Sequence, residues 1–156
     1  MNQLAELIRR YDRPGPRYTG YPMPPAWSDD FPEPEVLAAL DRADVRKDEA
    51  LSLYLHTPFC PRRCAYCGCN VVVSPQYDPV EAYLEAVTKE LDLVCSHLKD
   101  RRQALQLHWG GGTPTYLNAA DLKRTFQLFK DRFEFLPGAE IAIEVDPTFL
   151  ESDQLP

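Results

Sequence analysis

Three short segments of this chain alternate apolar and polar residues, and two longer segments with a helical repeat separate them. The alternating segments are residues 51–56, 104–109 and 140–146. Alternation with a period of two predicts strands with two different faces, whereas an apolar residue at every third or fourth position predicts helices. The order strand, helix, strand, helix, strand is typical of an α/β fold with a parallel sheet and right-handed crossovers.

Both connecting segments begin with helix start signals. We expect Asp78 to be the N-cap of the first helix, with Pro79 at its first position and Glu81 at its third, and Asn118 to cap the second. The apolar stripes of the two helices are Val80, Leu84, Val87, Leu91, Cys95 and Leu98 in the first, and Leu122, Phe126, Phe129 and Phe133 in the second.

The two faces of the predicted strands differ in chemistry. We expect one face to pack under the helices through Leu51, Leu53, Leu55, Leu105, Leu107, Trp109, Ile141, Ile143 and Val145. The other face carries Tyr54, His56, Gln106, His108, Glu144 and Asp146. A doubly wound sheet is apolar on both faces, so a polar face favours a curved sheet or barrel around a wet cavity. Sites in such folds lie beyond the carboxyl ends of the strands.

Three strands cannot close a barrel. We therefore expect this chain to be the front part of a longer protein, or to need a partner that completes its sheet. Residues 1–48 are predicted to form an N-terminal arm with short helices at 2–10 and 33–43, and residues 49–156 the first part of the barrel. Five prolines and two glycines in residues 13–25 exclude helix and central strand. This stretch is either a linker or a functional arm.

Charge and composition exclude several classes of function. A net charge of −7 argues against nucleic acid and anionic membranes as partners. No segment approaches the roughly 20 apolar residues that span a bilayer, and residues 1–11 lack the pattern of a secretory signal. These features predict a cytoplasmic protein. Clustered cysteines in a reducing compartment indicate metal or redox chemistry instead of disulfides.

Four of the five cysteines lie within ten residues, in the spacing C-x3-C-x2-C-x-C from Cys60 to Cys69. Thiolates on a loop hold iron–sulfur clusters, and three of them would leave one iron open for a substrate or cosubstrate, as in an open zinc site. Arg62 and Arg63 favour the thiolate form. The alternative is a zinc knuckle that uses all four cysteines. Structural zinc sites usually draw pairs from two separated segments, so the spacing favours the cluster without excluding zinc.

Several further residues are candidates for a site. Residues 110–115, Gly-Gly-Gly-Thr-Pro-Thr, follow the second strand and lack the ending of a P-loop. They form either a tight turn or a loop whose backbone approaches a ligand. Glu144 points into the polar face or is a surface residue. His56 and His108 stand at strand ends and are candidates for proton handling or substrate contact, whereas Cys95 fits a core thiol.

Together these motifs resemble the radical S-adenosylmethionine (SAM) superfamily, which has C-x3-C-x2-C after its first strand and a SAM-binding glycine loop after its second. Longer stretches resemble the oxygen-independent coproporphyrinogen III oxidases within it. These stretches are residues 15–22, 54–60, 67–70, 107–117 and 143–147. The resemblance implies a partial (βα) TIM-like barrel of the radical SAM type, with its first three strands and two helices, preceded by an extended N-terminal arm.

The resemblance implies an oxidoreductase of porphyrin and haem biosynthesis. Cys60, Cys64 and Cys67 would bind a 4Fe–4S cluster, and SAM would chelate its open iron; Cys69 matches a family cysteine that is not a ligand. An electron from the cluster would cleave SAM to methionine and a 5′-deoxyadenosyl radical. That radical would abstract hydrogen from the β-carbon of a propionate, and loss of carbon dioxide and an electron would leave a vinyl group. Two rounds convert coproporphyrinogen III to protoporphyrinogen IX.

The family also implies two SAM molecules per site, an electron donor such as flavodoxin or ferredoxin, and a monomer at full length. Matching positions assign Tyr54, Gly111 and Glu144 to the cluster-bound SAM, and Tyr66, Gly112 and Thr113 to the second. Arg17 is a hypothetical contact to a substrate carboxylate. The family's later strands and C-terminal domain are absent from these 156 residues, so we expect the chain to be inactive by itself.

The chain departs from the family pattern at two positions. Tyr66 stands where the family usually has Phe, and Thr57 replaces a common Ile. The alternative within the superfamily is a haem chaperone, since such proteins share the cluster and glycine motifs. They typically lack the Cys-Gly-Cys-Asn motif at 67–70 and the arm at 15–19, both of which are present here. The oxidase is therefore favoured.

Overall fold

The computed structural model describes residues 3–12, 26–28 and 30–154. The chain forms two compact units, residues 1–33 and 34–156. The first contains helix α1 (Gln3–Tyr11), within a residue of the predicted helix at each end. The proline-rich stretch at 13–25, with Arg17, lies outside the described residues. The division at residues 48 and 49 stays a prediction.

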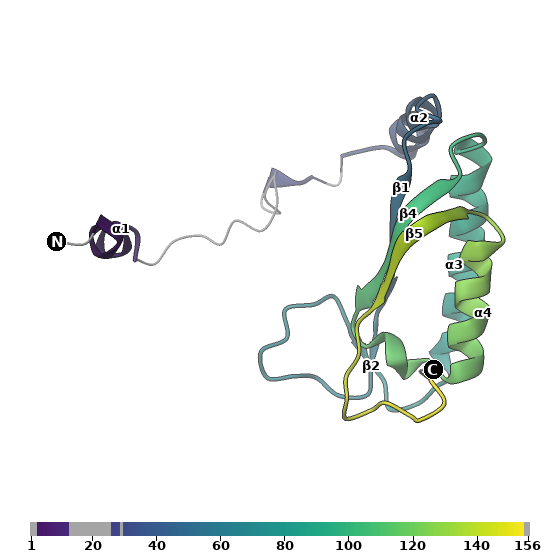
Figure 1. The fold of residues 1–156 in the computed structure, drawn as a ribbon. Coiled ribbons are helices and arrows are strands. Elements are labelled where there is room, and N and C mark those ends of the chain that lie inside the picture. Colours follow the sequence, from purple (N-terminus) through teal and green to yellow (C-terminus); the bar gives the residue numbers. More distant parts are fainter. Residues whose placement is uncertain (1–2, 13–25, 29, 155–156) are drawn as a thin grey trace. The chain divides into compact units, whose positions relative to one another are not determined.

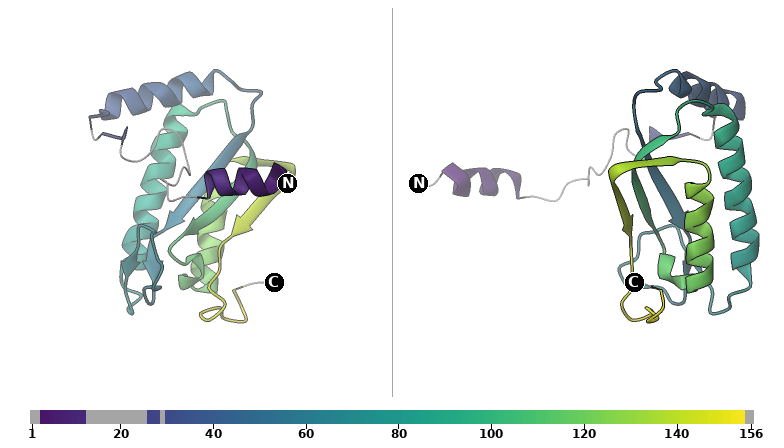
Figure 2. Two further views of the ribbon diagram at one scale, coloured as in Figure 1. Left: turned by 90° about the vertical axis from the view of Figure 1, so that its left-hand side faces the viewer. Right: turned by 45° about the vertical axis from the view of Figure 1, so that its right-hand side comes forward.

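The second unit is an α/β fold with a three-stranded parallel sheet in the order β1-β4-β5, as predicted. Helices α3 and α4 cover the same face of this sheet (Figures 1 and 2). The elements are α2 (Glu33–Asp44), β1 (Leu51–Thr57), β2 (Phe59–Cys60), β3 (Val72–Val73), α3 (Pro79–His97), β4 (Gln103–Gly111), η2 (Pro114–Tyr116), α4 (Ala119–Lys130) and β5 (Glu134–Ile143).

The core lies between the sheet and the two helices. Leu84 of α3, Leu107 of β4 and Leu117 before α4 are almost fully buried, and burying one such side chain contributes about 1.5–3 kcal/mol. The predicted helix stripes are buried as expected, with Phe126 only half-buried against the core. Phe133 is buried too, but it follows the end of α4 at Lys130 instead of lying in the helix. No helix within the described residues has the length and apolar character needed to cross a membrane.

The start signals of the two helices differ in outcome. Asn118 caps α4 as predicted, since its side chain accepts a hydrogen bond from the backbone N–H of Asp121 at 2.8 Å. Asp78 stands at the N-cap position of α3, as predicted, without acting as a cap. Its backbone is already helical and its side chain makes no cap hydrogen bond, although Pro79 does take the first turn.

One strand face is predicted wrongly at Leu105, which is 51% exposed. The pairing of β1 with β4 steps from Leu51 opposite Ala104 to Ser52 opposite Gln106, so Leu105 is an extra residue in a bulge. Ala104 takes the buried place that alternation assigns to Leu105. Beyond the bulge, Leu107 and Trp109 face the helices as predicted.

The last strand also differs from its prediction. It runs from Glu134 to Ile143 with a register shift, so Glu144 and Asp146 follow the strand. Ile141 lies on β5, an edge of the described sheet, and is 51% exposed instead of buried. Val145 follows the end of the strand and is 43% exposed. Only Ile143 of this predicted face packs against the core.

Helix α2 is attached to the start of β4. Asp44 at its end accepts hydrogen bonds from the backbone N–H groups of Asp100 and Arg101, at 2.8 and 2.9 Å. The buried Arg101 side chain donates to the carbonyl of Glu49 at 2.7 Å. The segment before β1 and the segment before β4 are thereby held together at the amino ends of the strands.

Candidate functional site

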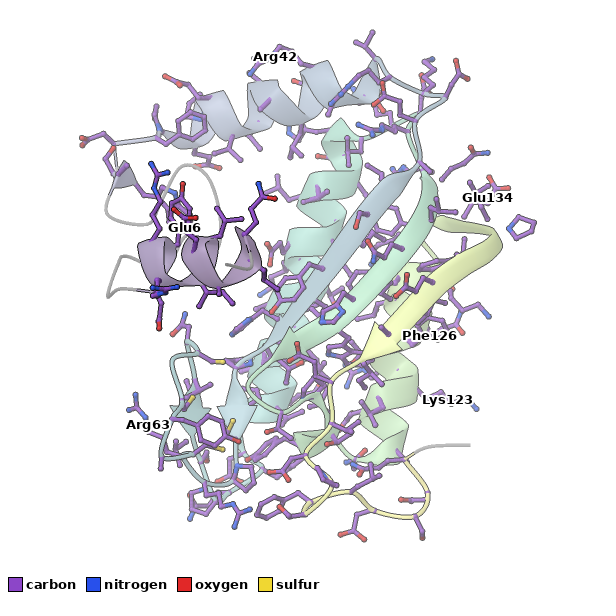
Figure 3. The ribbon with its side chains drawn as sticks, turned by 60° about the vertical axis from the view of Figure 1, so that its left-hand side comes forward. Glu6, Arg42, Arg63, Lys123, Phe126 and Glu134 are labelled. Atoms are coloured by element: carbon purple, nitrogen blue, oxygen red, sulfur yellow. The ribbon has the colours of Figure 1, made fainter. Side chains whose placement is uncertain are left out.

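The loops that follow β1, β4 and β5 lie together at the carboxyl ends of the strands, as the sequence predicts for a parallel sheet. Arg63 in the loop after β2 lies at this end, and Glu134 at the start of β5 lies at the opposite end (Figure 3). The three loops contain the predicted cysteines, the glycine run and Glu144, respectively.

The exit from β1 is fixed by the buried side chain of Thr57. Its hydroxyl accepts a hydrogen bond from the indole nitrogen of Trp109 at 2.7 Å. Tyr83 of α3 donates from its hydroxyl to the carbonyl of His56 at 2.9 Å. A helix and a neighbouring strand therefore both hold the backbone that leads to Cys60.

The cysteine loop is closed at its base by a second, two-stranded sheet that sequence reasoning missed. Phe59 and Cys60 pair in parallel with Val72 and Val73. The N–H of Val72 donates to the carbonyl of Pro58 at 2.7 Å. The run of three valines at 71–73 is the signal that could have predicted it.

The glycine loop lies directly against the β1 exit. The N–H of Gly112 donates to the carbonyl of Thr57, and the N–H of Thr113 donates to that of Phe59, both at 2.8 Å. A Cβ atom on Gly112 would stand 2.7 Å from the Phe59 oxygen and 2.9 Å from Cys60 Sγ. Gly111 has a φ of +116°, which other residues rarely adopt. Close approach therefore requires these glycines.

Glu144 is held over this loop by two donors. Its Oε1 lies 3.1 Å from Nε2 of His108, and its Oε2 accepts from the N–H of Gly111 at 3.2 Å. The ring of Tyr54 stacks on His108 with centroids 5.9 Å apart. Desolvation, and then the negative charge of Glu144, raise the pKa of Tyr54, which stays a neutral phenol.

His56 connects β1 to the cysteine loop. Its Nε2 lies 2.8 Å from the carbonyl oxygen of Asn70 and its Nδ1 lies 3.1 Å from the hydroxyl of Tyr54. Because a carbonyl only accepts, Nε2 carries the proton and Nδ1 accepts from the phenol. Both ring nitrogens thus have protein partners. A catalytic role for His56 stays a prediction.

The thiols of the loop differ in their surroundings. Cys60 is buried, with Sγ 3.5 Å from Thr113 Oγ1, whereas Cys64 and Cys69 are exposed and Cys67 is half-buried. Desolvation, and next the neighbouring Cys67, raise the pKa of the Cys69 thiol. All are free thiols. Among the described residues, no three His, Cys, Asp or Glu side chains are spaced to bind a metal ion. Cys95 is buried in the α3 stripe.

A hollow of about 570 Å³ lies between the cysteine loop and the segment after β5. It brings together Cys64, Tyr66, Gly112, Thr113 and Glu144, five of the residues that the sequence marks for a site. Tyr54, His56 and Gly111 do not line it and lie around Glu144 on the polar face. A second cavity, of about 360 Å³, lies between β1 and α3 and is lined mostly by core side chains.

Arg62 joins the two sides of this hollow, and sequence reasoning missed this contact. Its guanidinium donates to the hydroxyl of Thr148 at 2.9 Å and lies 5.0 Å from the ring centre of Phe149. Thr148 in turn donates to Asp146 from both its hydroxyl and its N–H. These hydrogen bonds, and next the charge of Arg62, lower the pKa of Asp146.

Comparisons with known proteins agree with this arrangement. Residues 54–155 match the radical SAM superfamily. The oxygen-independent coproporphyrinogen III oxidase of Escherichia coli strain K12 is 46% identical over 149 residues, which are 96% of this chain and 32% of that protein. The protein of the same name from Mannheimia haemolytica is 38% identical over 90% of this chain and 94% of its own length.

A solved structure is similar as well. It is the coproporphyrinogen III oxidase of Escherichia coli, described as a radical SAM enzyme, with a TM-score of 0.79 and 40% identity. The match covers 94% of this chain and 31% of that one. It supports the predicted fold, the first strands and helices of a radical SAM barrel. The chain spans about a third of the length of most relatives reported above.

Proposed function

Since this chain belongs to the radical SAM superfamily, we propose that it forms the cluster-binding and SAM-binding part of an oxygen-independent coproporphyrinogen III oxidase. The observation that carries this proposal is the meeting of three loops beyond β1, β4 and β5, with Gly112 packed against Cys60 and Glu144 held over Gly111. Such an arrangement places the Cys64 thiol, the backbone of Gly112 and the Glu144 carboxylate around one hollow.

The chemistry of the loop fits an iron–sulfur cluster. Cys60, Cys64 and Cys67 are free thiols on one loop whose base is closed by the β2–β3 pair, and they would hold three irons of a 4Fe–4S cluster. When bound and reduced, such a cluster supplies the electron that cleaves SAM.

The residues proposed to contact SAM form two groups around Glu144. Tyr54, Gly111 and Glu144 lie on the polar face and would orient the cluster-bound SAM. Tyr66, Gly112 and Thr113 line the hollow of about 570 Å³, a size typical of small-molecule sites, and would hold a second SAM molecule. The carboxylate of Glu144, which lines this hollow, suits a ligand that has amino or hydroxyl groups.

The substrate proposed for the complete site is coproporphyrinogen III, which appears in the names of the relatives. An electron carrier such as flavodoxin or ferredoxin would reduce the cluster, in a cytoplasmic and monomeric enzyme. His56 remains a candidate for substrate or proton contact, since it lies at the strand end beside Tyr54.

Metal analysis tests the site against its zinc alternative. The chain is reconstituted anaerobically with iron and sulfide, with zinc present in a parallel sample. We expect close to four irons and four sulfides per chain and a broad visible absorption. Stoichiometric zinc with no such absorption would instead show a zinc-stapled module.

A chimera tests the substrate. This chain replaces the matching segment of the Escherichia coli relative, with Cys64→Ala as the control. We expect anaerobic, SAM-dependent conversion of coproporphyrinogen III to protoporphyrinogen IX, and none in the control. Tight haem binding without conversion would support the haem chaperone and overturn the oxidase.

A further inference from the structure

We infer that His108 is a positioning residue that holds Glu144 and Tyr54 in place for SAM. This inference rests on the proposed function, because it concerns two of the side chains proposed to contact the cluster-bound SAM. His108 does not line the hollow. It acts through its neighbours and is not itself proposed to touch SAM.

The strand register places His108 between these two side chains. On β4 it lies opposite Tyr54 of β1 on one side and opposite Ala142 of β5 on the other. Ala142 has only a methyl group on this face. The imidazole can therefore extend past β5 to Glu144, which is two residues further along the chain.

The contact to Glu144 sets the orientation of its carboxylate. A carboxylate only accepts, so the Nε2 of His108 carries the proton and donates across the 3.1 Å to Oε1. The second oxygen accepts from Gly111, and a Cβ on Gly110 would stand 2.8–2.9 Å from the carboxyl group. The carboxylate is thus pressed against the backbone and oriented by one donor on each oxygen.

The contact to Tyr54 supports an otherwise exposed ring. Tyr54 is 58% exposed, and its ring plane lies within 10° of that of His108. The hydroxyl of Tyr54 is hydrogen-bonded to His56 and its ring is stacked on His108, so the side chain has little conformational freedom. Ordering it before SAM binds removes an entropic cost of binding.

Two substitutions separate the two contacts. His108→Phe keeps an aromatic face for Tyr54 and removes the donor to Glu144, so SAM affinity should fall about tenfold, the usual effect of losing a hydrogen bond to a charged group. His108→Gln keeps a donor and loses the ring, and the fall should be about threefold. Gln106→Ala, on the same strand face, is the matched control and should bind SAM as the wild type does.

A double-mutant cycle distinguishes positioning from a general structural role. SAM affinity is measured by equilibrium dialysis on the reconstituted chain, with iron content and thermal melting as checks. In a Glu144→Gln background, His108→Phe should weaken SAM binding less than twofold, because it acts through Glu144. The full tenfold loss in both backgrounds, or wild-type affinity of His108→Phe, would overturn the inference.

A wrong proposed function gives a different result from a wrong role for His108. In that case the wild-type reconstituted chain itself binds no SAM. If His108→Phe melts early, His108→Gln is measured in a Tyr54→Leu background instead, because this variant loses the ring that stacks on Tyr54. A threefold loss that disappears in the Tyr54→Leu background supports positioning, and one that persists contradicts it.

Discussion

Gly112 is the residue at which the glycine loop, the β1 exit and the first predicted ligand come closest. Two backbone oxygens and Cys60 Sγ all lie within 2.9 Å of the place that a Cβ would take. Backbone oxygens cannot move aside as the end of a flexible side chain can. The requirement for glycine here comes from close approach in space, which the spacing of the sequence motif suggests but does not measure.

Gly112→Ala should lower the free energy of unfolding by about 1–3 kcal/mol, because the added methyl group overpacks this contact. Gly68→Ala is the matched control, since nothing lies within 4 Å of its Cβ position, and it should change stability by less than about 0.5 kcal/mol. Urea unfolding of the metal-free chain measures both. Equal effects would show that the contact at Gly112 is not specific.

The cysteines make a second prediction at this scale. Cys64→Ala should abolish cluster binding and SAM cleavage. Cys95→Ala should leave both intact and cost about 1 kcal/mol of stability, since Cys95 is buried in α3. Iron and sulfide content report the cluster in the reconstituted chain, and SAM cleavage is assayed in the chimera. Loss of iron from both variants would mean that the ligand assignment is wrong.

Alternation and spacing predicted which residues approach the site, but not what each one touches. The prediction of the polar face was correct for Tyr54 and His108. In β1 and in the second half of β4, no bulge interrupts the alternation of apolar and polar residues. The hydrogen bond from His108 to Glu144 could not be predicted, since Glu144 follows the end of β5 and its direction depends on Ala142 and Gly110.

Elements were predicted best where local signals are strong. Helices α3 and α4 follow their apolar repeats, and the order of the sheet follows from the connections. The bulge at Leu105 and the early start of β5 could not be predicted. Gly138 adopts a φ of +83° next to Pro137, inside the irregular part of β5. The β2–β3 pair has only two residues in each strand, which is too short for a recognisable alternation in the sequence.

The cysteine loop is attached to the segment after β5 by Arg62. Arg62→Ala should leave the free energy of unfolding within about 1 kcal/mol of wild type, because the contact is exposed. It should nevertheless loosen the loop, so that chymotrypsin cleaves after the exposed Tyr66 several times faster. Arg63→Ala, which makes none of these contacts, is the control. Equal cleavage of both variants would remove Arg62 as the attachment.

The attachment of α2 predicts a pH dependence. The backbone N–H of Arg101, as the main cause, lowers the pKa of Asp44 below its ordinary value of 3.8. Its ionised form therefore stabilises the fold fully above about pH 4, and this contribution is lost as the pH falls through the lower folded-state pKa.

We expect Asp44→Asn to be less stable than the wild type at pH 6, with the difference shrinking below pH 4. Denaturant unfolding between pH 6 and 3 measures it. Asp48→Asn, a nearby exposed carboxylate outside this contact, is the control. A difference for Asp44→Asn that is constant across this range would contradict the assignment.

At the scale of the whole molecule, helices cover one face of the sheet, and the other face and the strand ends carry the chemistry. The described residues of the second unit bring the cysteine loop, the glycine loop and the segment after β5 to one end of the sheet (Figures 1 and 3). The central claim is that these loops together hold a 4Fe–4S cluster with an iron open to SAM.

Electron paramagnetic resonance of the reduced, reconstituted chain tests this claim most directly. Spectra are recorded without SAM and with a saturating concentration of it. Because SAM would chelate the open iron, the signal of the reduced cluster should change its g values when SAM is added, and the change should be absent with Glu144→Ala at the same concentration. An identical spectrum of the wild-type chain with and without SAM would contradict the account.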